Sequence, residues 1–411
     1  MKIMAKALTL LLVLSMLPLS AGCNSGADSA ASSAASKKPA SSAVSSEAKS
    51  ETATSSEPLI PAVNDYSTRT YNFTEITEYL KINGRYAVTK TDSKTGSKPC
   101  ISFDHTAQLL AFNADCEGDV VIDMTAASLA DEGREEKYFL VVVDGVEERM
   151  LVNGMRGTEA KLSLTIAKNL KRGKHTFEVY RQFELTNGIC NLVSVTMNGV
   201  PTERPKNKDL YIEFFGDSIT AGFGNLTTSD DKVNTHYPDK SSGTDTYAFY
   251  TAKALNADMS AVARSGLAFS YGITGTPIET FWKETSYARS TLGKYQAERQ
   301  PDIVVVNLGT NDHYNYEDKG LTREQLYEAA VKFLQMVRAD RPNAKIVWVY
   351  GMMGDKIQDE IERAVEEMGG ESKGYYFHKA QRGQNGGSAH PAKADHQVAS
   401  EGLVEFIKGI M

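Results

Sequence analysis

The spacing of apolar residues divides the chain into two regions. Between residues 65 and about 203, short runs in which apolar and polar positions alternate recur between turn signals such as Asp144-Gly145 and Arg172-Gly173. The clearest runs are residues 100–103, 119–124, 138–143 and 175–180. Alternation with a period of two is typical of strands, so this region is predicted to be an all-β sandwich or jelly roll. Such modules bind sugars in many proteins, and a purely structural role is equally open.

From Asp209 onward, short apolar runs alternate with helical patterns instead. The expected strands are residues 210–215, 259–263, 303–308, 346–350 and 375–378, and the expected helices are residues 244–255, 322–338, 357–368 and 392–407. Buried parallel strands separated by helices predict an α/β domain, here a flavodoxin-like three-layer one. In such sheets functional residues gather at the carboxyl ends of the strands.

The first 62 residues carry no pattern of a folded domain. Lys2 and Lys6 precede an apolar stretch at 7–19, which small residues and Cys23 follow. This resembles a bacterial lipoprotein signal, which implies a lipid on Cys23 and anchoring outside the cytoplasmic membrane. The alternative is a secretory signal cleaved near Ala21. A spanning helix is disfavoured, because the stretch is short of the ~20 residues that a bilayer requires.

The predicted organisation therefore has four parts. Residues 1–23 are the signal, and residues 24–62, nearly all Ser, Ala, Lys, Glu and Thr, form a disordered tether. Residues 63–205 are the β-sandwich, and residues 206–411 are the α/β domain. Either form of the signal implies export.

Charge and cysteine content limit the possible binding partners, disulfides and metal sites. The net charge is −7 and the isoelectric point about 5.7, which disfavours nucleic acid as a partner. With Cys23 assigned to lipid, Cys100, Cys116 and Cys190 allow at most one internal disulfide, and Cys100–Cys116 is a possible pair. No spacing resembles a zinc site, and no metal or cofactor is expected.

Candidate chemistry begins where the first parallel strand ends. Gly216-Asp217-Ser218-Ile219-Thr220 follows that apolar run. Gly216 permits a tight turn, which would expose the Ser218 hydroxyl at the start of a helix, where backbone N–H groups favour negative charge. A serine that only caps a helix is the alternative. The rarity of this sequence after an apolar strand favours Ser218 as a nucleophile.

This segment resembles the first conserved block of the SGNH hydrolases, also called the GDSL family. Three further segments resemble the remaining blocks in the expected order, and they contain Gly266, Asn311 and His390. The resemblance implies that Ser218, Gly266 and Asn311 donate hydrogen bonds to an oxyanion and that His390 is the base. Taken alone, Gly266 and Asn311 would be turn residues. His396 is the rival base, but it lies in an expected helix and is predicted to be at the surface.

Ester hydrolysis requires this combination. A serine hydroxyl is a weak nucleophile, so a base must remove its proton during attack and return it to the leaving alcohol. The tetrahedral intermediate places charge on one oxygen, and losing one donor to that oxygen typically costs ~10²–10³ in turnover.

One position departs from the family pattern. SGNH hydrolases usually have an Asp three residues before the histidine, where this chain has Gly387. Asp395 is near in sequence but lies beyond Pro391. The hypothesis is a Ser–His dyad in which a backbone carbonyl of residues 386–388 orients the imidazole.

The dyad and the preceding sandwich resemble family 2 carbohydrate esterases. That resemblance implies removal of O-acetyl groups from plant cell-wall polysaccharides such as xylan or glucomannan. Trp282, His313 and Tyr314 are candidate substrate-binding residues, although Trp282 could equally be core; Trp348 is expected to be core. The alternatives are an SGNH lipase or thioesterase acting on other acyl esters, and a non-catalytic, lipid-anchored glycan-binding protein.

Overall fold

A computed structural model describes residues 65–127, 136–153, 160–233, 238–270, 278, 282–287 and 289–411. All of them belong to one compact unit, Glu57–Met411. The predicted signal with Cys23 and the whole of the predicted tether, residues 24–62, lie outside the described residues. Within the described ranges, no helix is both long and apolar enough to cross a bilayer.

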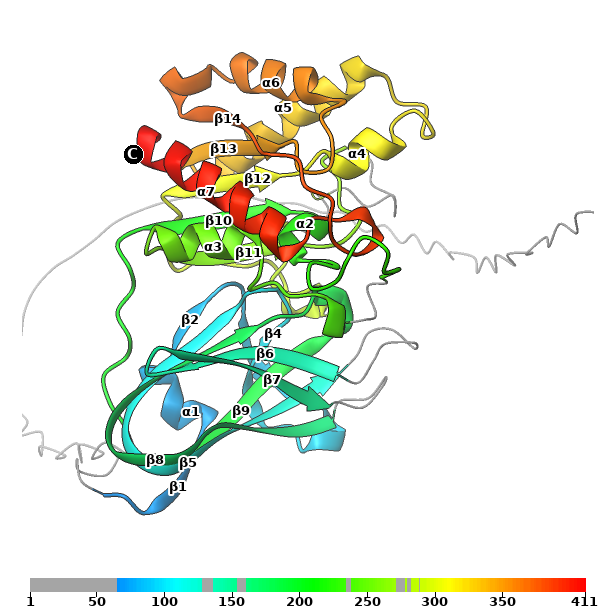
Figure 1. The fold of residues 1–411 in the computed structure, drawn as a ribbon. Helices are drawn as coiled ribbons and strands as arrows, with labels where there is room; N and C mark the ends of the chain where they lie inside the picture. Colours follow the sequence, from blue (N-terminus) through cyan, green and yellow to red (C-terminus); the bar gives the residue numbers. More distant parts are fainter. Residues whose placement is uncertain are drawn as a thin grey trace, which may run out of the picture. The chain divides into compact units, whose positions relative to one another are not determined.

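The N-terminal region is a nine-stranded antiparallel sheet (Figure 1). Its strands are β1 (Thr68–Asn72), β2 (Lys81–Asn83), β3 (Ala87–Lys90), β4 (Pro99–Phe103), β5 (Leu109–Ala127), β6 (Glu136–Val143), β7 (Val146–Asn153), β8 (Ala160–Arg181) and β9 (Ile189–Pro201). The order is β3-β4-β9-β5-β8-β6-β7, with β1 on β9 and β2 on β5. The sheet-rich region expected from the alternation is thus present, and the sandwich or jelly-roll description stays a prediction.

Two of these strands are much longer than the alternation suggested. β5 has 19 residues and β8 has 22, against a usual five or six. The turn expected at Arg172-Gly173 is wrong, because both residues lie inside β8, with Gly173 opposite Cys116 and bulges just beyond. Bulges bend a strand, and Figure 1 shows β5 and β8 as strongly curved strands. The short helix α1 (Phe73–Ile76) packs against β1, β4 and β9.

The cysteines lie inside this region. Cys100, Cys116 and Cys190 are all buried on β4, β5 and β9, and they form no disulfide. The possible Cys100–Cys116 pair is therefore not made. Because none of these three cysteines forms a cross-link, stability of this region rests on burial of its apolar faces.

The second sheet has five parallel strands. They are β10 (Tyr211–Gly216), β11 (Asp258–Ala263), β12 (Ile303–Asn307), β13 (Lys345–Tyr350) and β14 (Tyr375–Lys379), in the order β11-β10-β12-β13-β14. The five strands expected from the apolar runs are confirmed to within one residue at each end. Because both faces are covered, nearly every position of these strands except β14 is buried.

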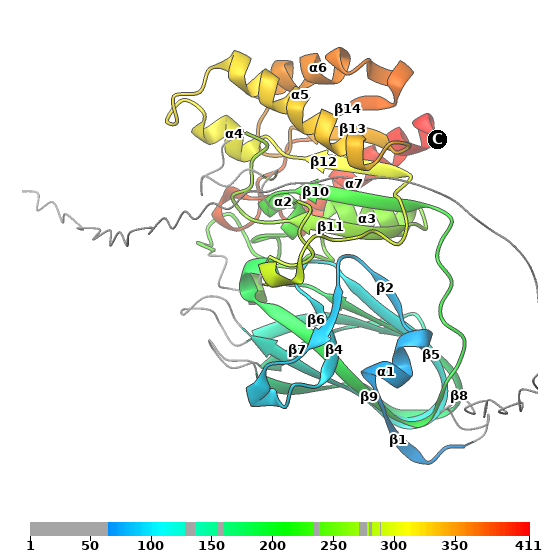
Figure 2. The same ribbon diagram turned by 180° about the vertical axis from the view of Figure 1, so that it is seen from behind.

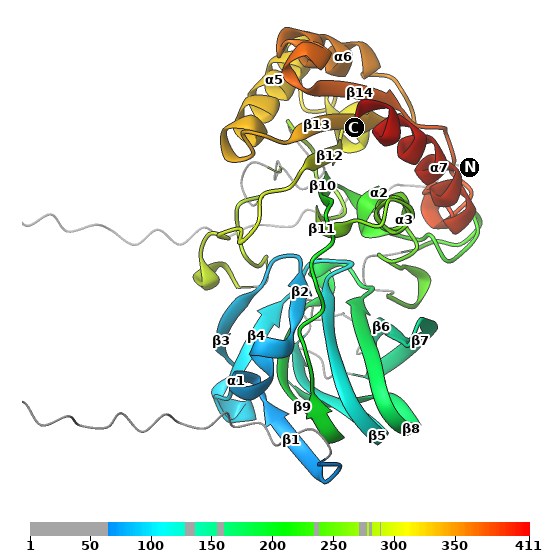
Figure 3. The same ribbon diagram turned by 90° about the vertical axis from the view of Figure 1, so that its left-hand side faces the viewer.

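Helices cover both faces of this sheet. They are α2 (Ser218–Ala221), α3 (Tyr247–Ala254), α4 (Thr310–Asn315), α5 (Arg323–Asp340), α6 (Gln358–Glu367) and α7 (Lys393–Ile410). One core places Phe215 and Val304 of the strands against Phe333 of α5 and Ile361 of α6, and a separate core on the other face contains Leu403 of α7. Figure 3 shows α5 and α6 on one side and α3 and α7 on the other, as the alternating direction of strand side chains requires.

A buried charge cluster joins the two sheets. Glu213 on β10 accepts hydrogen bonds from Arg85, which lies between β2 and β3, and from Arg341 after α5. Its Oε2 lies 2.7 Å from Arg341 Nε, and all three side chains are buried. Figure 2 shows this side of the molecule, where β2 approaches the parallel sheet.

Glu213→Gln is expected to lower the free energy of unfolding by about 3–5 kcal/mol, because it leaves two buried guanidinium groups without their counter-charge. Denaturant titration would measure the loss. The control is Glu324→Gln, whose pair with Arg363 is more than half exposed and should cost less than about 1 kcal/mol. Equal losses in the two variants would contradict a special role for Glu213.

Candidate active site

Ser218 lies directly after the central strand β10. Asp217 caps α2, with its Oδ1 accepting the Ile219 N–H at 2.9 Å. Position 216 must be glycine, since a Cβ there would lie 2.0 Å from Thr220 Oγ1. This close packing turns the chain sharply into α2 and places Ser218 as its first residue, 5% exposed, at the carboxyl end of the sheet.

His390 contacts this serine directly. Its Nε2 lies 2.9 Å from Ser218 Oγ, and its Nδ1 lies 3.1 Å from the carbonyl oxygen of Ser388. If Nδ1 carries the proton and donates it to this carbonyl, Nε2 keeps a lone pair facing the serine hydroxyl. The Phe223 ring packs beside the imidazole, with ring centroids 4.6 Å apart.

The turn that supplies the carbonyl is tightly constrained. Ser388 and Ala389 both have positive φ, 53° and 57°, which is costly for residues with a side chain. The turn is held by bonds from Gly387 N to Gly224 O at 2.9 Å and from Ser388 N to Asp231 O at 2.8 Å.

A side chain at position 387, where the usual SGNH pattern has an Asp, has no room. A Cβ there would lie 2.3 Å from Val233 Cγ2 and 2.4 Å from Thr227 Oγ1. Asp395 does not replace that acid. Its carboxylate accepts the N–H groups of Ala392 and Asn385 at 2.8 and 3.0 Å and so holds the start of α7.

The three expected oxyanion donors follow three adjacent strands. Gly216 at the end of β10 pairs with Ala263 of β11 and Asn307 of β12, so Ser218, Gly266 and Asn311 emerge at one edge. Within the described residues, the N–H groups of Ser218 and Gly266 donate no hydrogen bond. Asn311 Nδ2 donates to Leu267 O at 2.6 Å and lies 3.4 Å from Asp217 Oδ2.

Three buried carboxyl groups surround these donors, and the sequence blocks did not point to their role. Burial raises the pKa of Asp217 to about 7, and it also raises the pKa values of Asp312 and Glu184. Asp312 accepts the N–H groups of Phe269 and Ser270, at 3.2 and 2.9 Å. Asp312 could have been suspected from its place beside Asn311, whereas Glu184 lies in the N-terminal region and carries no sequence signal.

Both tryptophans, including the candidate substrate-binding residue Trp282, lie in the core. Trp282 is 1% exposed and packs against Phe215 and Phe333, so of its two open roles the structure supports core packing and contradicts stacking on a sugar. The aromatic ring fills the core between β10 and α5. Trp348 is core, as expected.

His313 and Tyr314 lie on α4, which follows β12 at the same edge as Asn311. His313 Nδ1 is 3.1 Å from Tyr350 Oη, and Tyr314 is 53% exposed with its hydroxyl donating to Met353 O at 3.2 Å. Their role in binding stays a prediction.

His396, the rival base, is fully buried, so its predicted surface position is wrong. Its ring stacks on Tyr247, and its Nδ1 accepts the Tyr247 N–H at 3.1 Å. Burial lowers its pKa to about 3. The ring thus joins α7 to α3.

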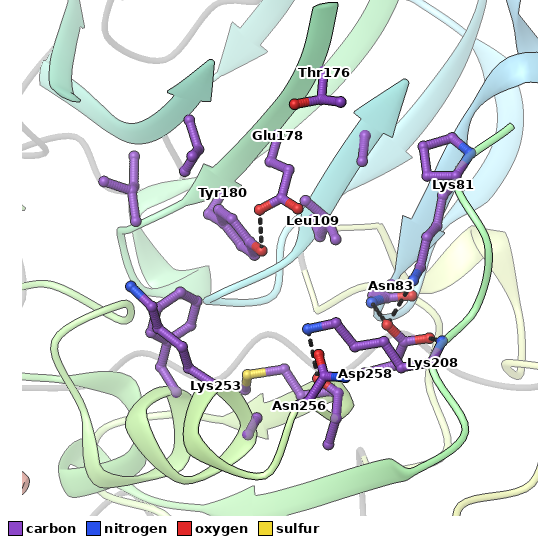
Figure 4. A pocket seen from close by; sticks show the side chains of 18 of the residues that line it. Lys81, Asn83, Leu109, Thr176, Glu178, Tyr180, Lys208, Lys253, Asn256 and Asp258 are labelled. Atoms are coloured by element: carbon purple, nitrogen blue, oxygen red, sulfur yellow. Dashed lines mark hydrogen bonds and ion pairs between the residues drawn. The ribbon is translucent and has the colours of Figure 1, made fainter. Parts of the chain in front are cut away.

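A cavity of about 540 Å³ lies elsewhere, between the N-terminal sheet and α3 (Figure 4). Its lining includes Lys81 and Asp258, whose side chains form an ion pair at 2.6 Å. Asp258 is the first residue of β11, so this cavity lies at the amino end of the parallel sheet. Ser218 lies at the other, carboxyl end. In the described part of the chain, no cluster of His, Cys, Asp and Glu is arranged to hold a metal ion.

Comparison with known proteins agrees with this geometry. Residues 214–392 match the model of the GDSL-like lipase/acylhydrolase family. The predicted resemblance to the GDSL hydrolases is confirmed. The cellulase/esterase CelE of Acetivibrio thermocellus is 27% identical over 304 residues, which are 69% of this chain and 35% of CelE. An acetylxylan esterase/glucomannan deacetylase of Cellvibrio japonicus is 25% identical over 259 residues, 59% of this chain and 71% of that protein.

The similarity in fold extends over most of the chain. The structure of a family two carbohydrate esterase from Clostridium thermocellum in complex with cellohexaose superposes with a TM-score of 0.68 at 23% identity. The match covers 81% of this chain and 100% of that one. This chain is thus similar in sequence to two proteins named as carbohydrate esterases and similar in fold to a family two carbohydrate esterase. This chain spans about a third of CelE, 35% of its length.

The pH dependence of activity should follow His390. Burial lowers its pKa below the ordinary 6.5, and the bond to the Ser388 carbonyl only partly opposes this. A base works in its neutral form, so kcat/KM for p-nitrophenyl acetate should rise with one ionisation whose midpoint lies below pH 6.5. A midpoint above pH 7 would instead indicate a carboxylate beside the imidazole and contradict the dyad.

Asp395→Asn should reduce kcat/KM less than about tenfold, because asparagine can still accept the Ala392 N–H and no bond reaches His390. His390→Ala in the same assay should lose on the order of 10³-fold or more. Comparable losses in both variants would show that Asp395 serves the histidine after all.

Proposed function

We propose that this protein is an exported serine esterase that removes O-acetyl groups from plant cell-wall polysaccharides. One observation carries the proposal: the Nε2 of His390 lies 2.9 Å from Ser218 Oγ while its Nδ1 faces a backbone carbonyl. This is a nucleophile and base within hydrogen-bond reach, with the base oriented by a third group. The substrate class is supported by the names of the relatives, an acetylxylan esterase/glucomannan deacetylase among them.

The proposed reaction proceeds in two halves. Ser218 Oγ attacks the acetyl carbonyl while His390 takes its proton, and the N–H groups of Ser218 and Gly266 donate to the resulting oxyanion. Collapse of the intermediate releases the sugar hydroxyl, which takes the proton from His390, and leaves acetyl on Ser218. Water then attacks this acyl-enzyme by the same route in reverse and yields acetate.

Asn311 is the third proposed donor. Asn311 Nδ2 donates one hydrogen to Leu267 O, with the two atoms 2.6 Å apart. Its other hydrogen faces Asp217 Oδ2, which lies 3.4 Å from Nδ2. The second hydrogen is weakly bonded and is therefore the one available to an oxyanion. The bond to Leu267 holds the amide plane in place, so little reorganisation is needed during the reaction.

The dyad stabilises the imidazolium without a carboxylate. When His390 is protonated, its Nδ1–H donates to the neutral carbonyl of Ser388, which fixes the ring but gives a weaker bond than an aspartate would. The tightly held turn at 387–389 compensates by positioning that carbonyl before substrate binds.

The cellular placement and domain description belong to the same proposal. A lipid on Cys23 would anchor the protein outside the cytoplasmic membrane, with residues 24–62 as a tether. A jelly-roll description of 63–205 and a flavodoxin-like one of 206–411 are supported by the antiparallel nine-stranded sheet and by the parallel order β11-β10-β12-β13-β14.

Acetate release tests the function. We expect the protein to release acetate from acetylated xylan or glucomannan much faster than it hydrolyses p-nitrophenyl butyrate. Ser218→Ala should lose about 10³-fold or more, while Ser372→Ala, which changes an exposed serine, should keep full activity. Faster butyrate hydrolysis would favour a lipase- or thioesterase-like enzyme. No turnover together with tight glycan binding would indicate a non-catalytic binder.

A further inference from the structure

The segment that carries Gly266 is residues 264–270, called here the oxyanion loop. It begins with a turn in which Leu267 N donates to Arg264 O at 3.2 Å, with Ser265 and Gly266 at the corners. Gly266 has φ 83°, as the third position of a type II turn requires. The direction of the Gly266 N–H therefore depends on how the peptide between Ser265 and Gly266 is held.

A carboxylate from the N-terminal region holds Ser265, the residue whose ψ angle sets the orientation of that peptide. Glu184 Oε1 accepts the Ser265 N–H and Oε2 accepts the Ser265 hydroxyl, each at 2.7 Å. Glu184 follows β8 of the N-terminal region and is buried. Two short bonds to one residue fix both its backbone and its side chain, so Ser265 has a single orientation.

Glu184 is itself held rigidly. Arg181, at the end of β8 and fully buried, donates to the backbone carbonyls of Phe183 at 2.7 Å, Glu184 at 3.2 Å and Gly188 at 2.6 Å. The guanidinium thereby shapes the segment after β8 into the form that presents the Glu184 carboxylate to the parallel sheet.

We propose that Glu184 is a positioning residue for the oxyanion: by binding Ser265 it aims the Gly266 N–H at the reacting carbonyl. The inference rests on the proposed esterase function. It means that the N-terminal β region completes the catalytic site by supplying the group that orders the oxyanion loop.

The remainder of the oxyanion loop does not depend on Glu184. The carbonyl oxygen of Leu267 accepts a hydrogen bond from Asn311. The N–H groups of Phe269 and Ser270 donate hydrogen bonds to the carboxylate of Asp312. Removing the Glu184 carboxylate should therefore free only the corner with Ser265 and Gly266, leaving the fold and the Ser218–His390 pair intact. A donor to the oxyanion acts in the transition state, so kcat should fall while KM changes little.

The test compares Glu184→Ala with Glu184→Gln. Alanine removes both acceptors, and kcat for p-nitrophenyl acetate should fall ~10²-fold with KM within about threefold. Glutamine keeps one oxygen for the Ser265 N–H and an amide for its hydroxyl, so it should restore kcat to within about fivefold of the parent chain. The matched control is Asp123→Ala, which removes another carboxylate of the N-terminal region that accepts bonds from Ser163 and Ser194 and should leave kcat unchanged.

Other outcomes would overturn the inference. An unchanged kcat in Glu184→Ala, or a glutamine variant as impaired as alanine, would contradict positioning through these two bonds. If alanine prevents folding, Glu184→Asp serves instead, because a shorter side chain cannot reach both Ser265 atoms and should lower kcat alone. Absence of Ser218-dependent hydrolysis in the parent chain would refute the proposed function itself, which distinguishes the two failures.

Discussion

The parallel register of β10 with β11 and β12 is the constraint on which the site depends. Gly216, Ala263 and Asn307 lie side by side at the carboxyl ends of these strands, so whatever follows each strand converges on one point. Ser218, Gly266 and Asn311 are separated widely in sequence, yet each needs only a short turn to reach that point. The apolar faces of the strands, covered by α3, α5, α6 and α7, hold this register rigidly.

The histidine reaches the same point by a different route, on a turn instead of a strand end. That turn places two residues, Ser388 and Ala389, at positive φ and leaves no space for a side chain at 387. The strain is balanced by bonds to Gly224 and Asp231. This turn places the backbone carbonyl of Ser388 3.1 Å from His390 Nδ1.

Buried charge links the N-terminal sheet to this framework. Arg85 donates a hydrogen bond to Glu213 on β10, and Glu184 accepts one from Ser265 after β11. Polar groups of the N-terminal region thus bind polar groups of the α/β domain. Buried ionic contacts of this kind contribute little net stability but strongly penalise any arrangement that leaves a partner unpaired. Of these contacts, the one between Glu184 and Ser265 reaches the oxyanion loop.

The sequence by itself determined the elements and the conserved blocks. Apolar runs marked all five parallel strands, and helical patterns marked the helices between them. The resemblance to the SGNH blocks marked Ser218, Gly266, Asn311 and His390. It also indicated the missing acid at 387 and a carbonyl in its place. Features that depend on distant partners were decided only by the tertiary structure. Trp282 and His396 are buried in the core, and β5 and β8 continue through their bulges. Glu184 binds the oxyanion loop. Periodicity reports which face of an element is buried, but the partner that a side chain meets is set by packing between segments remote in the chain.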